Sequence, residues 1–135
     1  MEQAIRQWAS FIKETTGVNV ELIECVIDKV HSHRFKPGKW HVYSFWLNES
    51  GEALKIGVAG PNSAARFSSQ HYNENSANSN LAKSLLKSSV CNGDAKAWIK
   101  SNTYRINAVF ENFSKPLAHA LEAHLHLLYE PRFEK

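Results

Sequence analysis

A β-hairpin between residues 40 and 58 constrains the fold of this chain more than any other feature. Residues 40–47 are rich in aromatic and β-branched side chains, and residues 53–58 form a second run that favours a strand. Between them lies Asn48-Glu49-Ser50-Gly51, which is typical of a turn because it combines asparagine, serine and glycine. The pattern predicts two antiparallel strands joined by a short loop. A sheet should therefore form the centre of the molecule.

Helical patterns lie on both sides of this hairpin. Apolar side chains recur at helical spacing from Ile5 to Ile12, and Gly17 is suited to end that helix. The apolar side chains of residues 22–30 suggest a second helix. Further helices are expected at residues 63–71, 81–86, 94–100 and 115–129, and a third strand is expected at residues 104–110. Together these elements predict an α+β fold.

Length and composition indicate one domain in a reducing compartment. The 135 residues suffice for one core, and 43% of them are hydrophobic. No apolar run is long enough to cross a bilayer, and the first residues lack the profile of a secretory signal. Cys25 and Cys91 have no partner motif, which favours buried thiols over a disulfide. We therefore expect a cytoplasmic protein with no membrane partner.

Six residues together suit the chemistry of one phosphodiester. Its hydrolysis requires a positive group near the nonbridging oxygens, an activated water and stabilisation of the departing alkoxide. Arg66 offers a planar fork of donors that matches a phosphate, and Glu122 can give one hard oxygen ligand to Mg²⁺ or Mn²⁺. The candidate catalytic residues are Tyr43, Lys55, Arg66, His71 and Glu122, with Gly57 where a nucleic-acid backbone would approach closely.

The order of these residues resembles the GIY-YIG nuclease family. His41-Val42-Tyr43 is similar to the first motif, Gly-Ile-Tyr, and Lys55-Ile56-Gly57 is similar to the second, Tyr-Ile-Gly. The resemblance extends to the family's arginine, its trailing His or Tyr, its metal-binding glutamate and the proline that ends the glutamate's helix, at Arg66, His71, Glu122 and Pro131. It implies a small three-stranded mixed sheet flanked by helices in residues 40–135. Residues 1–39 would then form an N-terminal helical extension packed on this core.

The resemblance also implies an activity. It implies a metal-dependent endonuclease that hydrolyses phosphodiester bonds in DNA, with Mg²⁺ or Mn²⁺ held by Glu122, and leaves a 5′-phosphate and a 3′-hydroxyl. Two positions depart from the family pattern. Lys55 occupies the place of the second tyrosine, as it does in some members, and Glu134 occupies the place of an asparagine that helps to hold the active site.

The expected proton acceptor depends on the register of the hairpin. A free phenol or amine is almost fully protonated near neutrality, because the reference pKa values are about 10 and 10.4. If Tyr43 and Lys55 lie together, they can share one proton, so that Tyr43 activates the water and Lys55 relays its proton. The two side chains share a face only if Tyr43 pairs with an odd-numbered residue of the second strand.

Two other functions are open on the sequence alone. One is a catalytically inactive nucleic-acid-binding module on the same fold. The other is a zinc-binding interaction protein, with ligands on one helix face at His119, Glu122 and His126. Further nucleic-acid contacts are expected in the basic stretch before the hairpin, at Arg34, Lys36 and Lys39. The formal net charge of +3 is compatible with such a partner, and a homodimer would be able to read a palindrome.

Overall fold

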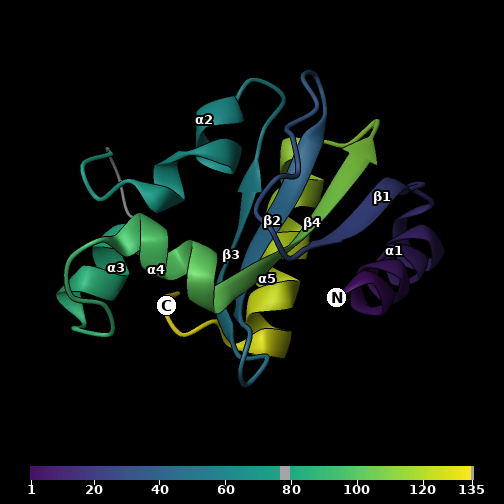
Figure 1. Ribbon diagram of the computed structural model, residues 1–135. Helices are drawn as coiled ribbons and strands as arrows, with labels where there is room; N and C mark the ends of the chain where they lie inside the picture. The colour runs from purple at the N-terminus through teal and green to yellow at the C-terminus, as the bar shows by residue number, and fades with distance from the viewer. Residues whose placement is uncertain (77–79, 135) are drawn as a thin grey trace.

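An antiparallel sheet with helices on both of its faces forms the centre of the molecule (Figure 1). The computed structural model describes residues 1–76 and 80–134. Its strands are β1 (Glu21–Asp28), β2 (Trp40–Leu47), β3 (Ala53–Ala59) and β4 (Thr103–Glu111). Its helices are α1 (Glu2–Thr16), α2 (Ala64–Ser68), α3 (Leu81–Lys87), α4 (Ala95–Asn102) and α5 (Lys115–Tyr129), with a 3-10 turn, η1 (Gln70–Tyr72), after α2. The expected α+β class is confirmed.

The sheet differs from the expected one in strand number and direction. Its order is β1-β4-β2-β3, and every neighbouring pair is antiparallel. The expectation of a three-stranded mixed sheet is therefore wrong. β2 and β3 form the predicted hairpin, and β4 pairs with the other side of β2. The fourth strand is β1, which occupies the outer edge beside β4.

β1 replaces the helix that the sequence suggests at residues 22–30. In its pairing with β4 the register shifts between Leu22 and Glu24, so Ile23 is an extra residue in a β-bulge. The bulge breaks the alternation that marks a strand, and the apolar residues then recur at a spacing that resembles a helix. Pairing with β4 decides the conformation, since strand formation depends on cross-strand contacts more than on local preference. The predicted helix α1 is confirmed, but the first 39 residues also supply a strand of the sheet.

Helices cover the two faces of the sheet as two separate layers (Figure 1). α1 and α5 pack on the face that carries Val42 and Phe110. α2, η1, α3 and α4 lie over the opposite face, which carries Tyr43 and Phe45 and is called the Tyr43 face below. Within the described residues, no helix has both the length and the apolar character needed to span a membrane.

Capping residues fix the ends of the helices that frame the sheet. Gly17 ends α1 in the left-handed conformation, with φ of 77°. Asp94 caps α4 by accepting a hydrogen bond of 3.0 Å from the Ala97 N–H. Ser114 caps α5 in the same way, by accepting from the Leu117 N–H at 3.4 Å. α5 consequently starts at Lys115, with three residues between it and the end of β4, and covers the predicted range.

Candidate active site

The hairpin register brings Tyr43 and Lys55 to the same face of the sheet. Tyr43 lies opposite Gly57, and Phe45 lies opposite Lys55. Directly opposite residues of an antiparallel pair point to the same side, and so do their neighbours two positions away. Tyr43 therefore pairs with an odd-numbered residue, as the expected site requires. Both side chains are buried under the helical layer of the Tyr43 face.

Gly57 leaves the space that the Tyr43 ring occupies. A methyl group at Gly57 would lie 2.6 Å from Tyr43 Cζ and still closer to the hydroxyl oxygen. Such contacts are far inside the van der Waals distance, so any other residue would displace the ring. The absence of a side chain at Gly57 is explained by this packing, without a nucleic-acid backbone.

The Tyr43 hydroxyl has one hydrogen-bond partner among the described residues, the imidazole of His71. The distance from His71 Nε2 to Tyr43 Oη is 2.7 Å, and the Leu81 N–H donates to His71 Nδ1 at 3.3 Å. Burial, together with the charges of Lys55, Arg66 and Arg105, lowers the pKa of His71 to about 2, so the ring is neutral. Since Nδ1 accepts, the proton must be on Nε2, which donates to the phenol. The Tyr43 oxygen therefore accepts from His71, and its own hydroxyl proton is directed away from the imidazole.

The Tyr43 phenol is itself held in its neutral form. Burial raises the pKa of Tyr43 well above its ordinary value, and the charges of Glu134 and Glu122 act in the same direction. The charges of Arg66 and Arg105 partly oppose this rise. At neutral pH Tyr43 is consequently a hydrogen-bond donor and not a ready base.

The two residues that depart from the family pattern contact each other. Lys55 Nζ lies 2.9 Å from Glu134 Oε1, and the Lys55 side chain is almost fully buried. Glu134 comes from residues 131–134, which we call the strap. The strap follows the edge of β3, because the N–H groups of Arg132 and Phe133 each donate at 3.0 Å to carbonyls of Ala53 and Leu54. The amine therefore has a carboxylate partner, whereas the expected pairing of Lys55 with Tyr43 is not among the hydrogen bonds of the described residues.

Arg66 and Glu122 lie at the solvent side of this buried group. Arg66 belongs to α2 and is half-buried. Glu122 belongs to α5, whose His126 Nε2 lies 2.7 Å from the Ile56 carbonyl oxygen and so holds the helix beside β3. One turn earlier on the same helix, the carboxylate of Glu122 is three-quarters buried. The charges of both residues influence the pKa of Tyr43, so both lie within electrostatic reach of its hydroxyl.

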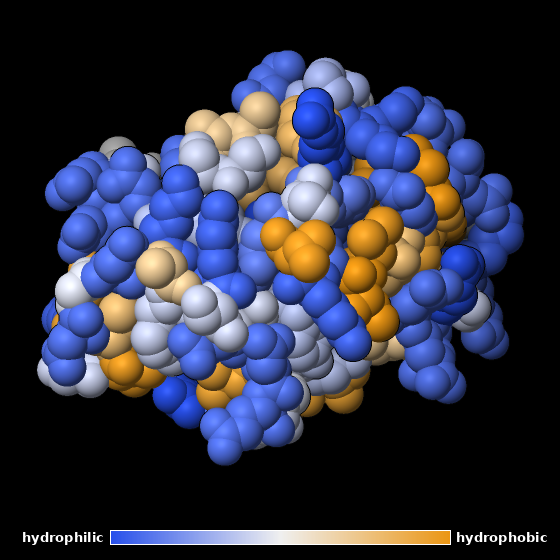
Figure 2. Space-filling model, viewed as in Figure 1, coloured by the Kyte–Doolittle hydropathy of each residue, from blue (hydrophilic) through white to orange (hydrophobic). Residues whose placement is uncertain are grey.

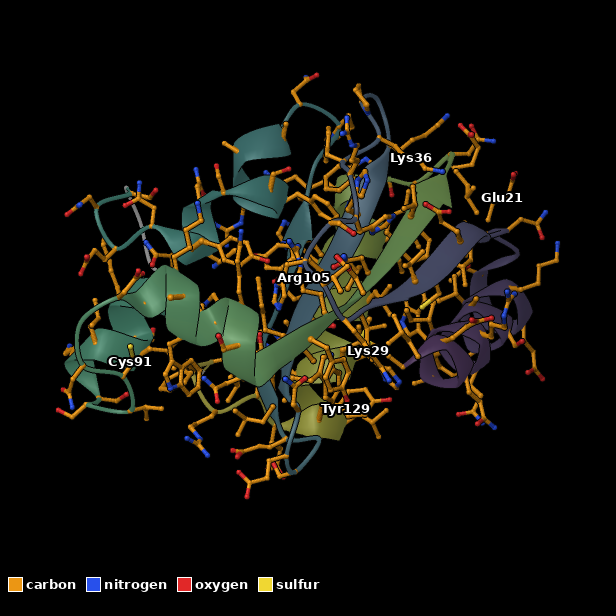
Figure 3. All side chains as sticks on the ribbon, in the orientation of Figure 1. Glu21, Lys29, Lys36, Cys91, Arg105 and Tyr129 are labelled. Carbon is orange, nitrogen blue, oxygen red and sulfur yellow. The ribbon has the colours of Figure 1, made fainter. Side chains whose placement is uncertain are left out.

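Arg105 is a buried cation that sequence patterns did not reveal. It extends from β4 into the middle of the molecule (Figure 3). Its guanidinium lies 4.7 Å from the Phe45 ring centre and 4.6 Å from that of Phe67, and Nη2 donates to the Phe67 carbonyl at 2.8 Å. Arg105 belongs to no recognisable spacing, whereas the sequence marks Glu134 only as a departure from the family's asparagine and not as a partner of Lys55. Their part in the site follows only from strand pairing and the path of the strap.

The basic stretch before the hairpin is largely neutralised by carboxylates. Lys36 Nζ lies 3.0 Å from Glu24, and Lys39 Nζ lies 2.6 Å from Glu111. Arg34 is exposed. Of the three residues expected to contact nucleic acid, Lys36 and Lys39 are thus paired with carboxylates, and Arg34 is exposed to a ligand.

The carboxylate of Glu122 suits a divalent ion that keeps its waters, whereas the expected zinc ligands do not come together. Among residues 1–76 and 80–134, no three His, Cys, Asp or Glu side chains converge as metal ligands, so His119, Glu122 and His126 do not form a zinc site. His126 is already bound to a backbone carbonyl. A single carboxylate such as Glu122 is sufficient for Mg²⁺, which keeps several waters and takes further oxygens from a phosphate.

Comparison with known proteins adds no relative to this picture. No protein family, curated protein or solved structure matches the chain. The resemblance to GIY-YIG nucleases consequently stays a prediction that depends on the residues described above.

Proposed function

We propose that this protein is a metal-dependent endonuclease that hydrolyses phosphodiester bonds in DNA through a GIY-YIG-like site. The observation that carries the proposal is the convergence of Tyr43, Lys55, His71, Arg66 and Glu122 on one region from five separate elements, β2, β3, η1, α2 and α5. A phenol, two cations and a carboxylate in one place match the demands of a phosphodiester in charge and in hydrogen bonding.

The roles follow from the charge state of each group. Arg66 binds the nonbridging oxygens of the phosphate, because its charge persists and its donors match two oxygens at once. Lys55, ion-paired with Glu134, contributes a second positive charge. Tyr43 orients the attacking water, with its hydroxyl proton directed away from His71. His71 keeps the phenol in place, because its Nε2–H donates to the hydroxyl oxygen of Tyr43.

Glu122 holds the divalent ion in this proposal. When bound, Mg²⁺ or Mn²⁺ supplies Lewis-acid activation of water and neutralises phosphate charge. This contribution matters here because Tyr43 is a neutral phenol and Lys55 has a carboxylate partner, so neither side chain is a ready base. In the proposed mechanism Tyr43 accordingly passes no proton to Lys55.

Access to the phenol requires a movement of the rim. Tyr43 is fully buried, and the partly exposed residues around it are Arg66, Glu122 and Glu134. A hollow of about 560 Å³, lined by His126 and Pro131 among others, reaches the strap at Glu134. We infer that a bound phosphate attracts Arg66 and displaces Glu134 outward along this hollow. Lys55 and the Tyr43 hydroxyl then face the substrate.

A nicking assay with matched carboxylate variants tests the proposal. Supercoiled plasmid, single-stranded DNA and RNA are incubated with Mg²⁺ or Mn²⁺ and with the wild type, Glu122→Gln or Glu49→Gln. Glu49 lies in the exposed hairpin turn and serves as the control for a lost carboxylate. We expect metal-dependent nicking that is lost in Glu122→Gln and kept in Glu49→Gln. Binding without nicking would instead identify an inactive nucleic-acid-binding module, and cleavage of RNA alone would change the substrate.

A further inference from the structure

The outer edge of β1, as far as residues 1–76 and 80–134 show, is where the sheet is open next to exposed apolar side chains. β1 pairs with β4 on one side only, since it is the terminal strand of the sheet. Ile23 and Ile27 on this strand are 44% and 63% exposed, and Val30 just beyond it is 76% exposed. Apolar side chains gather over this region in the space-filling view (Figure 2). An unpaired edge with apolar side chains readily pairs with another strand.

Two common protections of an edge strand, lysine and proline, are absent from β1, since Glu21–Asp28 contains neither. The charges of its two internal acids are taken up by groups of the same chain. Glu24 is bound by Lys36 at 3.0 Å and by His33 at 3.1 Å. Asp28 is buried and accepts from the N–H groups of Ser32 and His33. The bulge, which often blunts an edge, here adds the apolar Ile23.

The charges of β1 suit an antiparallel copy of itself. Glu21 begins the strand and Lys29 follows its last residue, so the two ends carry opposite charges (Figure 3). Antiparallel pairing of two identical strands places the acidic end of each beside the basic end of the other. It also brings Ile23 of one copy to Ile27 of the other when Cys25 lies at the centre. A twofold interface of this kind is closed and self-complementary.

We propose that two copies of this chain pair through β1, antiparallel and with Cys25 on the twofold axis, so that two four-stranded sheets become one sheet of eight strands. This proposal is independent of the nuclease activity. The occupant of the edge is a second copy of this chain.

Sedimentation of the full chain between about 10 µM and about 1 mM tests the association. We expect a dimer whose dissociation constant rises at least about tenfold in Ile27→Lys, because a lysine at an edge opposes pairing. Leu127→Lys is the matched control, since Leu127 is 84% exposed on α5, away from the edge. A wild type that stays monomeric over this range, or a dimer unaffected by Ile27→Lys, would overturn the proposal.

Oxidative cross-linking tests the register. The two Cys25 residues would lie directly opposite each other, within the Cα separation that a disulfide spans, while Cys91 is buried. We expect a disulfide-linked dimer that disappears in Cys25→Ser and in Ile27→Lys. Because Cys25 is itself partly buried, a second pair in the Cys25→Ser background, Glu24→Cys on one copy and Val26→Cys on the other, should also cross-link. A dimer in which neither pair cross-links would refute this arrangement.

Discussion

Gly57 illustrates how one residue can be required by packing inside a candidate catalytic site. The Tyr43 ring covers its Cα, and a methyl group there would overlap the ring and its hydroxyl. We expect Gly57→Ala to lower the free energy of unfolding by about 1–3 kcal/mol, as overpacking of a core does. Urea unfolding measures this change.

Gly60→Ala is the matched control for that substitution. A methyl group at Gly60 would meet Trp40 at 3.6 Å, an ordinary contact, and no unusual backbone angle is required there. We expect its effect to stay within about 0.5 kcal/mol. Equal losses in the two variants would contradict the packing role of Gly57.

Buried neutral histidines predict loss of stability in mild acid. Burial, as the largest cause, lowers the pKa of His71 to about 2 and that of His41 to about 4. Both values lie below the unfolded value of about 6.5, so the unfolded chain binds more protons and stability falls as the pH drops below that value. For each histidine the loss at about pH 5 is roughly 2 kcal/mol.

His71→Gln separates the contribution of His71 from the rest. Glutamine offers an N–H to Tyr43 but takes up no proton, so the unfolding free energy of this variant should decline by roughly 2 kcal/mol less than the wild type between about pH 7.5 and about pH 5. Urea unfolding at the two pH values provides the comparison. An unchanged decline in His71→Gln would show that His71 is protonated in the folded protein.

At the scale of elements, the strap and β3 are joined by an ion pair that is largely buried. We expect Lys55→Met and Glu134→Gln each to destabilise the protein, because each leaves a charge without its partner. Their double variant should lose less than the sum of the two, with a coupling of about 1–3 kcal/mol from a double-mutant cycle of urea unfolding.

The same strap supplies an exposed pair for comparison. Arg132 contacts Glu52, and both side chains are 40% exposed, so water screens the pair. The cycle of Arg132→Gln with Glu52→Gln should give a coupling below about 1 kcal/mol. If the two cycles give equal couplings, burial is not what strengthens the contact between Lys55 and Glu134.

The sequence predicts an element well when the residues that determine its conformation lie within the element itself. The hairpin and α5 were predicted within one residue of their ends, since turn residues, caps and apolar periodicity lie inside the segments themselves. β1 was missed because its bulge obscures the alternation and its stability comes from β4.

The same distinction applies to the site. The register of Tyr43 is a condition for the site, and the structure meets it, whereas the burial of Arg105 and the contact of Glu134 with Lys55 depend on tertiary pairing that no local pattern encodes.

At the scale of the whole molecule, the proposed dimer and the proposed nuclease site have a geometric relation. A twofold axis perpendicular to the joined sheets keeps the Tyr43 faces of both copies on the same side. From β2 of one copy to β2 of the other there are five strand spacings of about 4.8 Å, or about 24 Å along the sheet, and from β3 to β3 there are seven, or about 34 Å. Both candidate sites would therefore face one DNA molecule at a separation of at most about one helical turn.

This relation predicts how a plasmid is cut. A dimer bound to one DNA holds its second site near the other strand at high effective concentration, so the second nick should quickly follow the first. We expect the wild type to convert supercoiled plasmid to the linear form with little open circle. Ile27→Lys, with unchanged site residues, should accumulate open circle first. Gel electrophoresis over time distinguishes these products. Direct linearisation by an Ile27→Lys protein that sediments as a monomer would show that pairing through β1 does not couple the two sites.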